Sequence, residues 1–528
     1  MEYSREAIDR QKKIQDMKNA GIICYANNYN GKQDISKIIE INSEKYKDVE
    51  YLMENGAIGE FKTAGRIISS RGMGKLVFGK IRDFSGDIQI SFMRDKVIFN
   101  TGKELVENII IEGEEKSAFK IAEKFCQVGD YIGVIGDLFL TKHGELTLFV
   151  KEFQVLSKAV RPLPEKFHGL SDEETIYRQR YLQLITDDEA YDRFLFRSKF
   201  VKSLRDFYDK NNFIEIETPV LGNSASGARA KPFTTFHNDF EEDFYLRIAP
   251  EVNLKKATVG RFERVFEIGK QFRNEGSDPS HMQEYTSVEH YAAWWNFEDN
   301  MRFTKEMFDY IFSDLKLNPK VNITDRNGIV KEVDFSREWE KIDYIEGVKD
   351  VTGIDVSTYN SGDEAILKKD IEKAGVKIEG IEKMGLTTMI DYLYKKALRP
   401  SIVGPAFVYN YPKNMQPLAR VNDENPKIVE QFQLVINGWE ILKAYSELVD
   451  PVEQQSNFDA QAKYLAQGDE EATAPDNDFV LAMEYGMPPQ SGWGMGVDRI
   501  IALITGQQNL RDTVLFPLMK SKKENIGE

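Results

Sequence analysis

The feature that most limits how this chain can fold is an abrupt change of sequence character near residue 160. From 61 to 158 the sequence is a series of short runs rich in β-branched and aromatic residues, separated by turn signals. The segment that follows carries Pro162, Pro164 and Gly169, residue types that interrupt both helices and strands. We therefore predict a domain boundary between 158 and 170.

The segment 61–158 holds about five strand-like runs, which predict a small closed β-barrel. Between Lys62 and Asp95 there are seven basic and three acidic residues, although the whole chain of 528 residues has a formal net charge of −16. Local positive charge and aromatic side chains such as Phe78 and Phe92 suit single-stranded nucleic acid, because bases stack on rings and phosphates meet cations. For either ring taken alone, a place in the barrel core is an equally good interpretation.

The remaining sequence divides into an N-terminal extension and a large mixed domain. Residues 1–60 are polar and helical in pattern, which is typical of a solvated helix or, alternatively, of a helix that lies along an acidic partner. Residues 171–528 begin with helical segments near 172–185 and 187–210 and continue with apolar alternation that predicts strands. Within this domain, residues 318–400 are polar and rich in Lys and Glu, and we predict a helical insertion there.

Composition limits the cellular setting of the protein. The overall negative charge argues against a protein that coats nucleic acid through its total charge, but it allows a local basic surface. Cys24 and Cys126 lie far apart in the sequence, which fits a reducing compartment. The charged N-terminus predicts no signal peptide, and no apolar run approaches the ~20 residues that span a bilayer. We expect a cytoplasmic protein without a membrane partner.

The first region that carries chemistry, residues 269–294, is predicted to form two strands around a polar loop. A period of two places four side chains on one face of the second strand: Tyr285, Ser287, Glu289 and Tyr291. On the incoming strand, Arg273 and Glu275 share a face. An arginine in a pocket suits a phosphate or a carboxylate, because its planar guanidinium binds two oxygens. A buried structural Arg–Glu pair is the alternative.

The second region, residues 491–506, has glycines at alternate positions directly before an apolar helix. Gly492, Gly494 and Gly496 leave one strand face without side chains, so that a flat ligand can approach the backbone, and Arg499 opens the helix. The G-x-G-x-G spacing and the lack of a surrounding βαβ pattern exclude a dinucleotide-binding fingerprint.

The third region, residues 432–451, carries two carboxylates. Glu440 and Glu447 could hold a cation. Asn437-Gly438 is also a strong type I′ hairpin signal, and a plain hairpin with exposed glutamates is an equally supported interpretation.

Taken in chain order, these motifs resemble those of the class II lysyl-tRNA synthetases over nearly the whole length. FIEIETPVL is similar to the family's first motif, with Pro219 at the dimer interface, FRNEGSDPSHMQEYT to the second and GWGMGVDR to the third. AGRIISSRGMGKLVFGKIRD resembles the N-terminal anticodon-binding barrel of the family. The resemblance implies an α+β fold, with an OB-type barrel before a class II catalytic domain in which helices flank an antiparallel sheet. It also implies a homodimer that uses ATP and Mg²⁺ to join lysine to tRNA(Lys).

The resemblance further implies roles for individual residues. Those implied for ATP are Arg273, Glu275, His281, Tyr285, Glu440 and Arg499, with Glu440 on magnesium and with Arg273 and Arg499 also catalytic. Those implied for lysine are Gly227, Glu251, Arg273, Glu289, Tyr291, Lys443 and Glu447, with Tyr291 and Glu447 on the ε-ammonium. Those implied for the anticodon are Arg71, Phe78, Gln89 and Glu145.

Elementary chemistry agrees with these roles. Activation of an amino acid is attack by its carboxylate on the α-phosphorus of ATP, which requires aligned anions and neutralised charge but no protein nucleophile. Recognition of a lysine side chain requires a desolvated carboxylate and a phenol, which Glu447 and Tyr291 supply. Five sites depart from the family pattern: Ser226, Asn253, Met282-Gln283, Gln433 and Lys443. Gln433 stands where a second metal-binding carboxylate is usual, and Lys443 replaces an asparagine beside the amino-acid carboxylate.

Two alternatives remain. A synthetase for aspartate or asparagine would share the barrel and the motifs, but the acidic Glu447 and Glu251 argue against aspartate. A paralogue that binds tRNA without aminoacylation is suggested by Gln433 and Lys443, whereas the presence of Arg273 argues against it. Adenylate formation in the absence of tRNA separates enzyme from binding module, and a comparison of lysine with aspartate separates the two enzymes.

Overall fold

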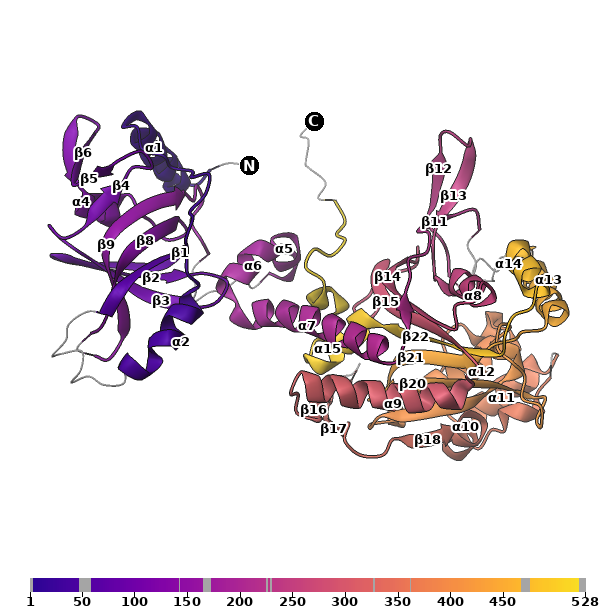
Figure 1. Ribbon diagram of the computed structural model, residues 1–528. Helices are drawn as coiled ribbons and strands as arrows, with labels where there is room; N and C mark the ends of the chain where they lie inside the picture. The colour runs from indigo at the N-terminus through magenta and orange to yellow at the C-terminus, as the bar shows by residue number, and fades with distance from the viewer. Residues whose placement is uncertain are drawn as a thin grey trace. The chain divides into compact units, whose positions relative to one another are not determined.

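The computed structural model of the chain separates into two compact units, residues 1–169 and 170–528 (Figure 1). The structure describes residues 3–46, 58–141, 143–164, 172–224, 227, 230–325, 328–360, 362–466 and 475–521. The predicted linker at 158–170 lies outside the described residues from 165 onward. No helix in these ranges is both long and apolar enough to cross a membrane.

The first unit is built around a closed barrel of five strands. These are β1 (Ile58–Met73), β2 (Leu76–Arg82), β3 (Asp87–Met93), β8 (Tyr131–Leu140) and β9 (Leu146–Ser157). The pairs β1–β2, β2–β3, β9–β8 and β8–β1 are antiparallel, and the parallel pair β3–β9 closes the ring. The predicted closed barrel is confirmed. Shorter elements complete the unit: β4 (Ile98–Asn100), β5 (Leu105–Val106), β6 (Asn108–Ile111), β7 (Glu114–Ser117) and α4 (Ala118–Lys124).

Strand register decides between the two interpretations of the aromatic side chains. Phe92 is buried in the barrel core, where its ring meets Phe153 edge-on with centroids 5.2 Å apart. Phe78 is half-buried and lies outside the core cluster, because Val77 and Ile81 on the same strand take the inward positions. Only Phe78 of the two rings is therefore placed to meet a ligand.

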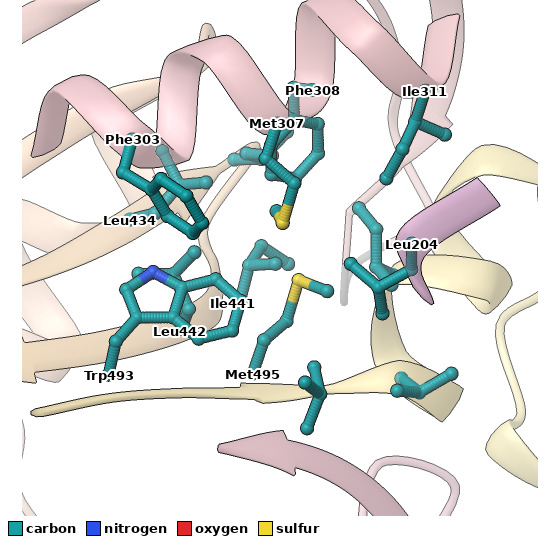
Figure 2. Close-up of a cluster of buried hydrophobic side chains, with 14 of the residues drawn as sticks. Leu204, Phe303, Met307, Phe308, Ile311, Leu434, Ile441, Leu442, Trp493 and Met495 are labelled. Carbon is teal, nitrogen blue, oxygen red and sulfur yellow. The ribbon is translucent and has the colours of Figure 1, made fainter. Parts of the chain in front are cut away.

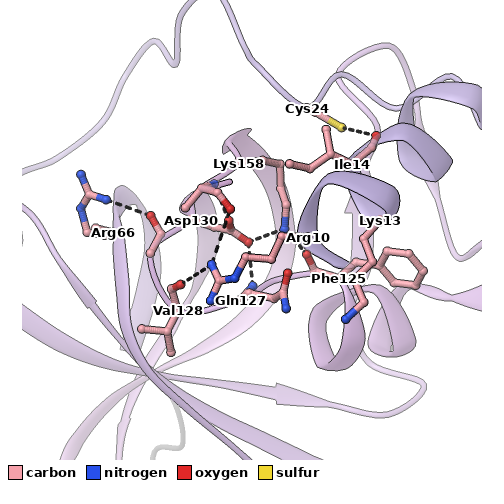
Figure 3. Close-up of polar contacts among 12 residues, drawn as sticks. Arg10, Lys13, Ile14, Cys24, Arg66, Phe125, Gln127, Val128, Asp130 and Lys158 are labelled. Atoms are coloured by element: carbon pink, nitrogen blue, oxygen red, sulfur yellow. Dashed lines mark hydrogen bonds and ion pairs between the residues drawn. The ribbon is translucent and has the colours of Figure 1, made fainter. Parts of the chain in front are cut away.

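The N-terminal helices α1 (Arg5–Asn19) and α2 (Ile35–Tyr46) pack against this barrel. Ile14 and Met17 of α1 are buried in the barrel core cluster, so α1 is neither a fully solvated helix nor free to lie along another molecule with that face. Beneath α1, the Arg10 guanidinium donates to the carbonyl of Val128 (2.9 Å), beside a fully buried ion pair of Asp130 and Lys158 (Figure 3).

The second unit is organised by an eight-stranded sheet in the order β10-β14-β15-β22-β21-β20-β19-β18. Its strands are β10 (Ile214–Glu215), β14 (Arg264–Phe272), β15 (Glu284–Ala293), β18 (Glu340–Asp343), β19 (Ala406–Pro412), β20 (Ile428–Ile436), β21 (Trp439–Ser446) and β22 (Gln490–Gly496). The end pairs β10–β14 and β18–β19 are parallel, and the pairs between them are antiparallel. The mixed α+β fold with a largely antiparallel sheet agrees with the sequence.

One face of this sheet is closed by helices. Of the helices α5 (Glu173–Arg178), α6 (Arg180–Thr186), α7 (Asp188–Lys210) and α9 (Phe297–Asp314), the last two supply buried side chains to the largest core cluster. Figure 2 shows Phe303 and Met307 of α9 directed toward Trp493 and Met495 of β22. Since this face is filled with apolar side chains, a ligand site on the sheet must lie on the other face.

The stretch 318–400 differs in part from the predicted helical insertion. It begins with a hairpin of β16 (Lys320–Thr324) and β17 (Val330–Asp334) and continues into β18, an edge strand of the main sheet. Helices follow only from Tyr344: α10 (Tyr344–Thr352), α11 (Glu364–Lys373) and α12 (Leu386–Leu393). Each hairpin strand buries only one side chain, Ile323 in β16 and Val333 in β17. The other positions are partly or fully exposed, which explains the polar composition of this segment.

The other strands and α-helices of this unit are β11 (Leu221–Gly222), β12 (Thr234–His237), β13 (Glu242–Leu246), α8 (Glu251–Val259), α13 (Pro451–Ala466), α14 (Asn477–Glu484) and α15 (Val497–Ile504). The apolar side of α15 packs into the same core cluster as α7 and α9. Helix α8 contributes Glu251 and α15 contributes Arg499 to the cavity described next.

Candidate active site

A cavity of about 690 Å³ lies over the face of the sheet opposite α9. The predicted site residues that line it are Gly227, Glu251, Arg273, Glu275, His281, Tyr285, Glu289, Tyr291, Glu440, Lys443 and Arg499. The structure thus brings together side chains from segments that are up to 272 residues apart. Glu447 is the exception, because it does not line the cavity and lies behind Gly492 and Tyr291.

Strands β14 and β15 form part of the floor of this cavity. They pair antiparallel over their full lengths, and Tyr285, Ser287, Glu289 and Tyr291 of β15 all line the cavity, as the period of two predicts. His290 points to the opposite face, where it accepts or donates one hydrogen bond with Tyr208 and one with Asn300, each 2.8 Å long. Burial lowers the pKa of His290 to about 3, so the ring is a neutral support for the strand.

The hairpin β20–β21 and the glycine strand β22 form the next part of the floor. Asn437 and Gly438 both have positive φ (44° and 74°), as the type I′ turn requires. Gly492 has no room for a side chain, since a Cβ there would lie 2.4 Å from Glu447 Oε1 and 2.4 Å from the Tyr291 ring. The alternating glycine was expected to admit a flat ligand, but at Gly492 it admits the protein's own Glu447 and Tyr291.

Three cations that line the cavity, Arg273, Lys443 and Arg499, have no carboxylate partner among the described residues. Arg273 makes no ion pair there, its Nε is buried without a hydrogen-bond partner, and its guanidinium carbon lies 5.4 Å from the centroid of the Tyr285 ring. Lys443 donates only to the amide oxygen of Gln416 (2.7 Å), and burial lowers its pKa. Arg273 and Lys443 together form a positively charged wall that suits an anion.

Three carboxylates, Glu251, Glu289 and Glu447, lie close enough in or beside the cavity to influence one another. Burial raises the pKa of Glu289 to about 8, with the negative charge of Glu251 acting in the same direction. Burial also raises the pKa of Glu447 to about 8, although the nearby ammonium of Lys255 acts against the shift. Carboxyl groups that are this costly to ionise in the empty pocket favour a positively charged ligand.

The residues implied for ATP lie beside the positively charged wall. The Arg499 guanidinium donates to the backbone carbonyl of Glu440 (2.7 Å), which fixes it at the start of α15. The Glu440 carboxylate is 3.9 Å from Arg399 and remains 29% exposed. His281 is exposed in the loop between β14 and β15, where its Nδ1 lies 2.8 Å from Asp278. Glu275, in the same loop, is exposed as well.

Comparison with known proteins assigns the two units to one family. A family model described as tRNA synthetases class II (D, K and N) matches residues 172–520, and a model described as an OB-fold nucleic acid binding domain matches residues 61–156. The chain belongs to the class II lysyl-tRNA synthetases. It is 41% identical to a lysine–tRNA ligase of Aquifex aeolicus, over 92% of this chain and 77% of the relative. It is 40% identical to one of Thermotoga maritima over 97% and 96%, and 37% identical to one of Lactococcus lactis subsp. cremoris over 97% of each chain.

These relatives do not favour the alternatives raised by the sequence. Each of them is named a lysine–tRNA ligase, and the similarity runs through both the barrel and the catalytic domain. The departures at Gln433 and Lys443 therefore occur in a chain that is similar to lysine–tRNA ligases over nearly its whole length. In the structure the two residues are cross-strand neighbours on β20 and β21.

The predicted anticodon residues of the synthetase share one surface of the barrel. Arg71 and Phe78 are register partners on β1 and β2. With the Gln89 amide oriented so that its nitrogen faces Glu145, the two groups are 2.8 Å apart. An aromatic ring, a guanidinium and a hydrogen-bonding pair are the groups that stack on and read unpaired bases.

Sequence reasoning missed several groups that shape the pocket. Lys255 of α8 forms ion pairs with Glu251 and Glu447, and the Tyr445 hydroxyl donates to Glu251. The spacing of four between Glu251 and Lys255 was a visible signal of a helical ion pair. The link from Lys255 to Glu447 joins segments 192 residues apart and left no local signal.

Proposed function

We propose that this synthetase joins lysine to tRNA(Lys) in two steps, through a lysyl-adenylate. The observation that carries the proposal is the set of charges in and beside the cavity. The cations Arg273 and Lys443 line it, together with the carboxylates Glu251 and Glu289, and Glu447 lies behind Tyr291. A lysine molecule carries the complementary charges, one carboxylate and two ammonium groups.

The residues divide the work of the first step by charge. Arg273 and Lys443 hold the lysine carboxylate and the α-phosphate together, so that a carboxylate oxygen attacks the α-phosphorus and pyrophosphate leaves. Glu251 and Glu289 bind the α-ammonium, while Tyr291 and Glu447 bind the ε-ammonium. Tyr285 and Arg499 sandwich the adenine, Glu275 reads its edge and His281 contacts the terminal phosphates. In the second step, the terminal ribose hydroxyl of tRNA attacks the carbonyl carbon and AMP leaves.

The test is amino-acid-dependent exchange of pyrophosphate into ATP, measured for all twenty amino acids without tRNA. We expect exchange with lysine alone, because lysine is the only one of the twenty amino acids with two ammonium groups. Exchange with aspartate or asparagine instead would move the specificity within the family. A folded protein that binds ATP but exchanges with no amino acid would overturn the proposal.

The donor groups fit a magnesium ion that is held mostly by the nucleotide. Glu440 supplies one carboxylate to the cavity, Gln433 supplies a neutral amide, and the described residues contain no cluster of three or more metal-binding side chains. Mg²⁺ is commonly bound through one or two carboxylates together with substrate phosphates. We propose that Glu440 holds the ion with the phosphates of ATP, where it neutralises phosphate charge.

Glu440→Gln is expected to weaken Mn²⁺ binding in the presence of ATP by about tenfold, because a neutral amide is a poor ligand for a hard cation. Free Mn²⁺ can be counted by electron paramagnetic resonance with no amino acid present, which separates metal binding from catalysis. Glu430→Gln on the neighbouring strand, outside the cavity, is the matched control. Equal Mn²⁺ affinity in both variants would exclude Glu440 as the ligand.

Lysine affinity is expected to rise by up to about a hundredfold per pH unit between pH 6 and 7 and more gently toward pH 8, because the pKa values of both Glu289 and Glu447 are raised to about 8. A protonated carboxyl group cannot pair with an ammonium, so lysine binding must release about two protons well below pH 8. Calorimetry in two buffers of different ionisation enthalpy measures the number of protons released directly. ATP affinity over the same range is the control, and a flat lysine profile would contradict the assignment of these carboxylates.

The same proposal covers the partners of the synthetase. Arg71, Phe78, Gln89 and Glu145 would bind the anticodon through stacking and hydrogen bonds. Ile214, Val220 and Leu221, all within the predicted first motif, are 41–51% exposed, as expected of apolar side chains that a second subunit covers. Sedimentation should then give about twice the 60.7 kDa of one chain. The two free cysteines agree with a cytoplasmic location.

A further inference from the structure

Lys255 is a buried charged side chain that the proposed reaction leaves without a role. It projects from α8, its side chain is 1% exposed, and its Nζ lies 2.6 Å from Glu251 Oε1 and 2.5 Å from Glu447 Oε2. It thus connects the two carboxylates proposed for the two ammonium groups of the substrate. Such a buried lysine is costly unless it is fully paired, which makes its position informative.

The contacts of Lys255 occupy one oxygen of each carboxylate. Glu251 Oε1 accepts from Lys255 and from the hydroxyl of Tyr445 (2.7 Å), and no hydrogen bond from the described residues reaches its Oε2. The Glu447 carboxylate is buried and does not line the cavity, and its charge is offset by the ion pair of Oε2 with Lys255 and by the backbone of Gly492. Lys255 therefore holds both carboxylates in place, and Glu251 keeps its Oε2 for a ligand.

A count of charges shows what ligand this arrangement suits. Glu251, Glu289 and Glu447 carry three negative charges when ionised, and Lys255 returns one positive charge, which leaves two negative charges. An amino acid with an α-ammonium and a second ammonium at the end of its side chain neutralises both of these negative charges, while its carboxylate contacts Arg273 and Lys443. An amino acid with the α-ammonium alone leaves one buried negative charge uncompensated, which is strongly unfavourable.

We propose that Lys255 is a positioning residue that makes this pocket selective for a diamino acid, by fixing the spacing and the charge of Glu251 and Glu447. The inference rests on the proposed function, since it assumes that the cavity binds an amino acid. Without Lys255, three carboxylates would face one another in a desolvated pocket and would take up protons instead of binding ammonium groups. The other charged or titratable groups near them are Arg247, Glu267, Arg273, Tyr291, Lys443 and Tyr445.

The test compares Lys255→Met and Lys255→Gln with Lys256→Met in the full-length protein. Methionine removes the charge and the hydrogen bonds, whereas glutamine removes the charge but can still donate to both carboxylates. Lys256, the next residue on α8, pairs with Asp478 (2.5 Å) near the surface and serves as the control. If Lys255→Met does not fold, Lys255→Gln keeps the test intact.

Both Lys255 variants are expected to raise the KM for lysine in pyrophosphate exchange by about 10- to 100-fold, with the KM for ATP unchanged. The reason is that each carboxyl whose pKa rises by about one unit costs about tenfold in affinity for a cation near neutral pH. The pH dependence of lysine affinity should move to higher pH in both variants. The two variants should also no longer have a lower KM for lysine than for the analogue in which a hydroxyl replaces the ε-ammonium.

Different failures of this experiment have different meanings. Absence of lysine-dependent exchange in the unmodified protein would overturn the proposed function itself. Normal exchange in the unmodified protein, with Lys255→Gln matching it in lysine KM, pH profile and selectivity, would overturn only the inference about Lys255. A lower melting temperature of Lys255→Met, with the KM for lysine unchanged, would show that Lys255 is merely structural and would overturn the inference as well.

Discussion

Arg273→Met is expected to lower kcat/KM for lysine-dependent pyrophosphate exchange by about 10³-fold. Arg273 is the only guanidinium proposed to contact both reacting anions, and it has no carboxylate partner of its own among the described residues. Loss of one preorganised donor to developing charge commonly costs 10²- to 10³-fold, and a charged, bidentate donor lies at the upper end of that range. Lys443, on the same wall, leaves some residual activity.

A matched variant separates this effect from a general loss of positive charge. Lys270 lies three residues earlier, on β14, with its side chain 39% exposed and outside the cavity. Lys270→Met removes the same charge from the same segment and should leave kcat/KM within about twofold. If both variants lose activity equally, or if Arg273→Met keeps more than a tenth of the activity, Arg273 does not align the reacting anions.

The sheet and the barrel could be predicted because their strands alternate. The period of two in β15 is enough to place Glu289 and Tyr291 on one face, and the Asn437-Gly438 turn fixes the register of the next hairpin. Both patterns are local, so they are readable before the fold is known. Most of the residues that the family resemblance assigns to ATP and lysine line the cavity that these strands form.

What could not be predicted depends on contacts between distant segments. Whether Phe78 or Phe92 faces inward follows from the register of β2 and β3 in the closed barrel, which composition does not reveal. The hairpin β16–β17 buries only one side chain in each strand, and its polar sequence was included in the predicted helical insertion. The pairing of Lys255 with Glu251 could be read from their spacing on one helix. Its second partner, Glu447, lies 192 residues further along the chain and gives no local signal.

Glu447→Gln is expected to lower kcat/KM for lysine by about 10²- to 10³-fold and to leave ATP binding unchanged. The amide keeps the shape of the side chain but removes the negative charge, and loss of one member of a buried charge pair costs about 2–5 kcal/mol. Glu447 is buried with its side chain 0% exposed, so water cannot replace the lost interaction. The measurement is pyrophosphate exchange at saturating ATP over a range of lysine concentrations.

The selectivity of the same variant identifies which end of lysine Glu447 binds. If Glu447 pairs with the ε-ammonium, Glu447→Gln should accept lysine and its ε-hydroxyl analogue almost equally, because no charge remains to distinguish them. If it served the α-ammonium, activity on both amino acids would fall together and their ratio would persist. Glu453→Gln on α13, where the carboxylate is 42% exposed, should match the unmodified protein on both substrates. A preserved preference for lysine in Glu447→Gln would therefore assign the ε-ammonium to another carboxylate of the pocket, with Glu289 the next in position.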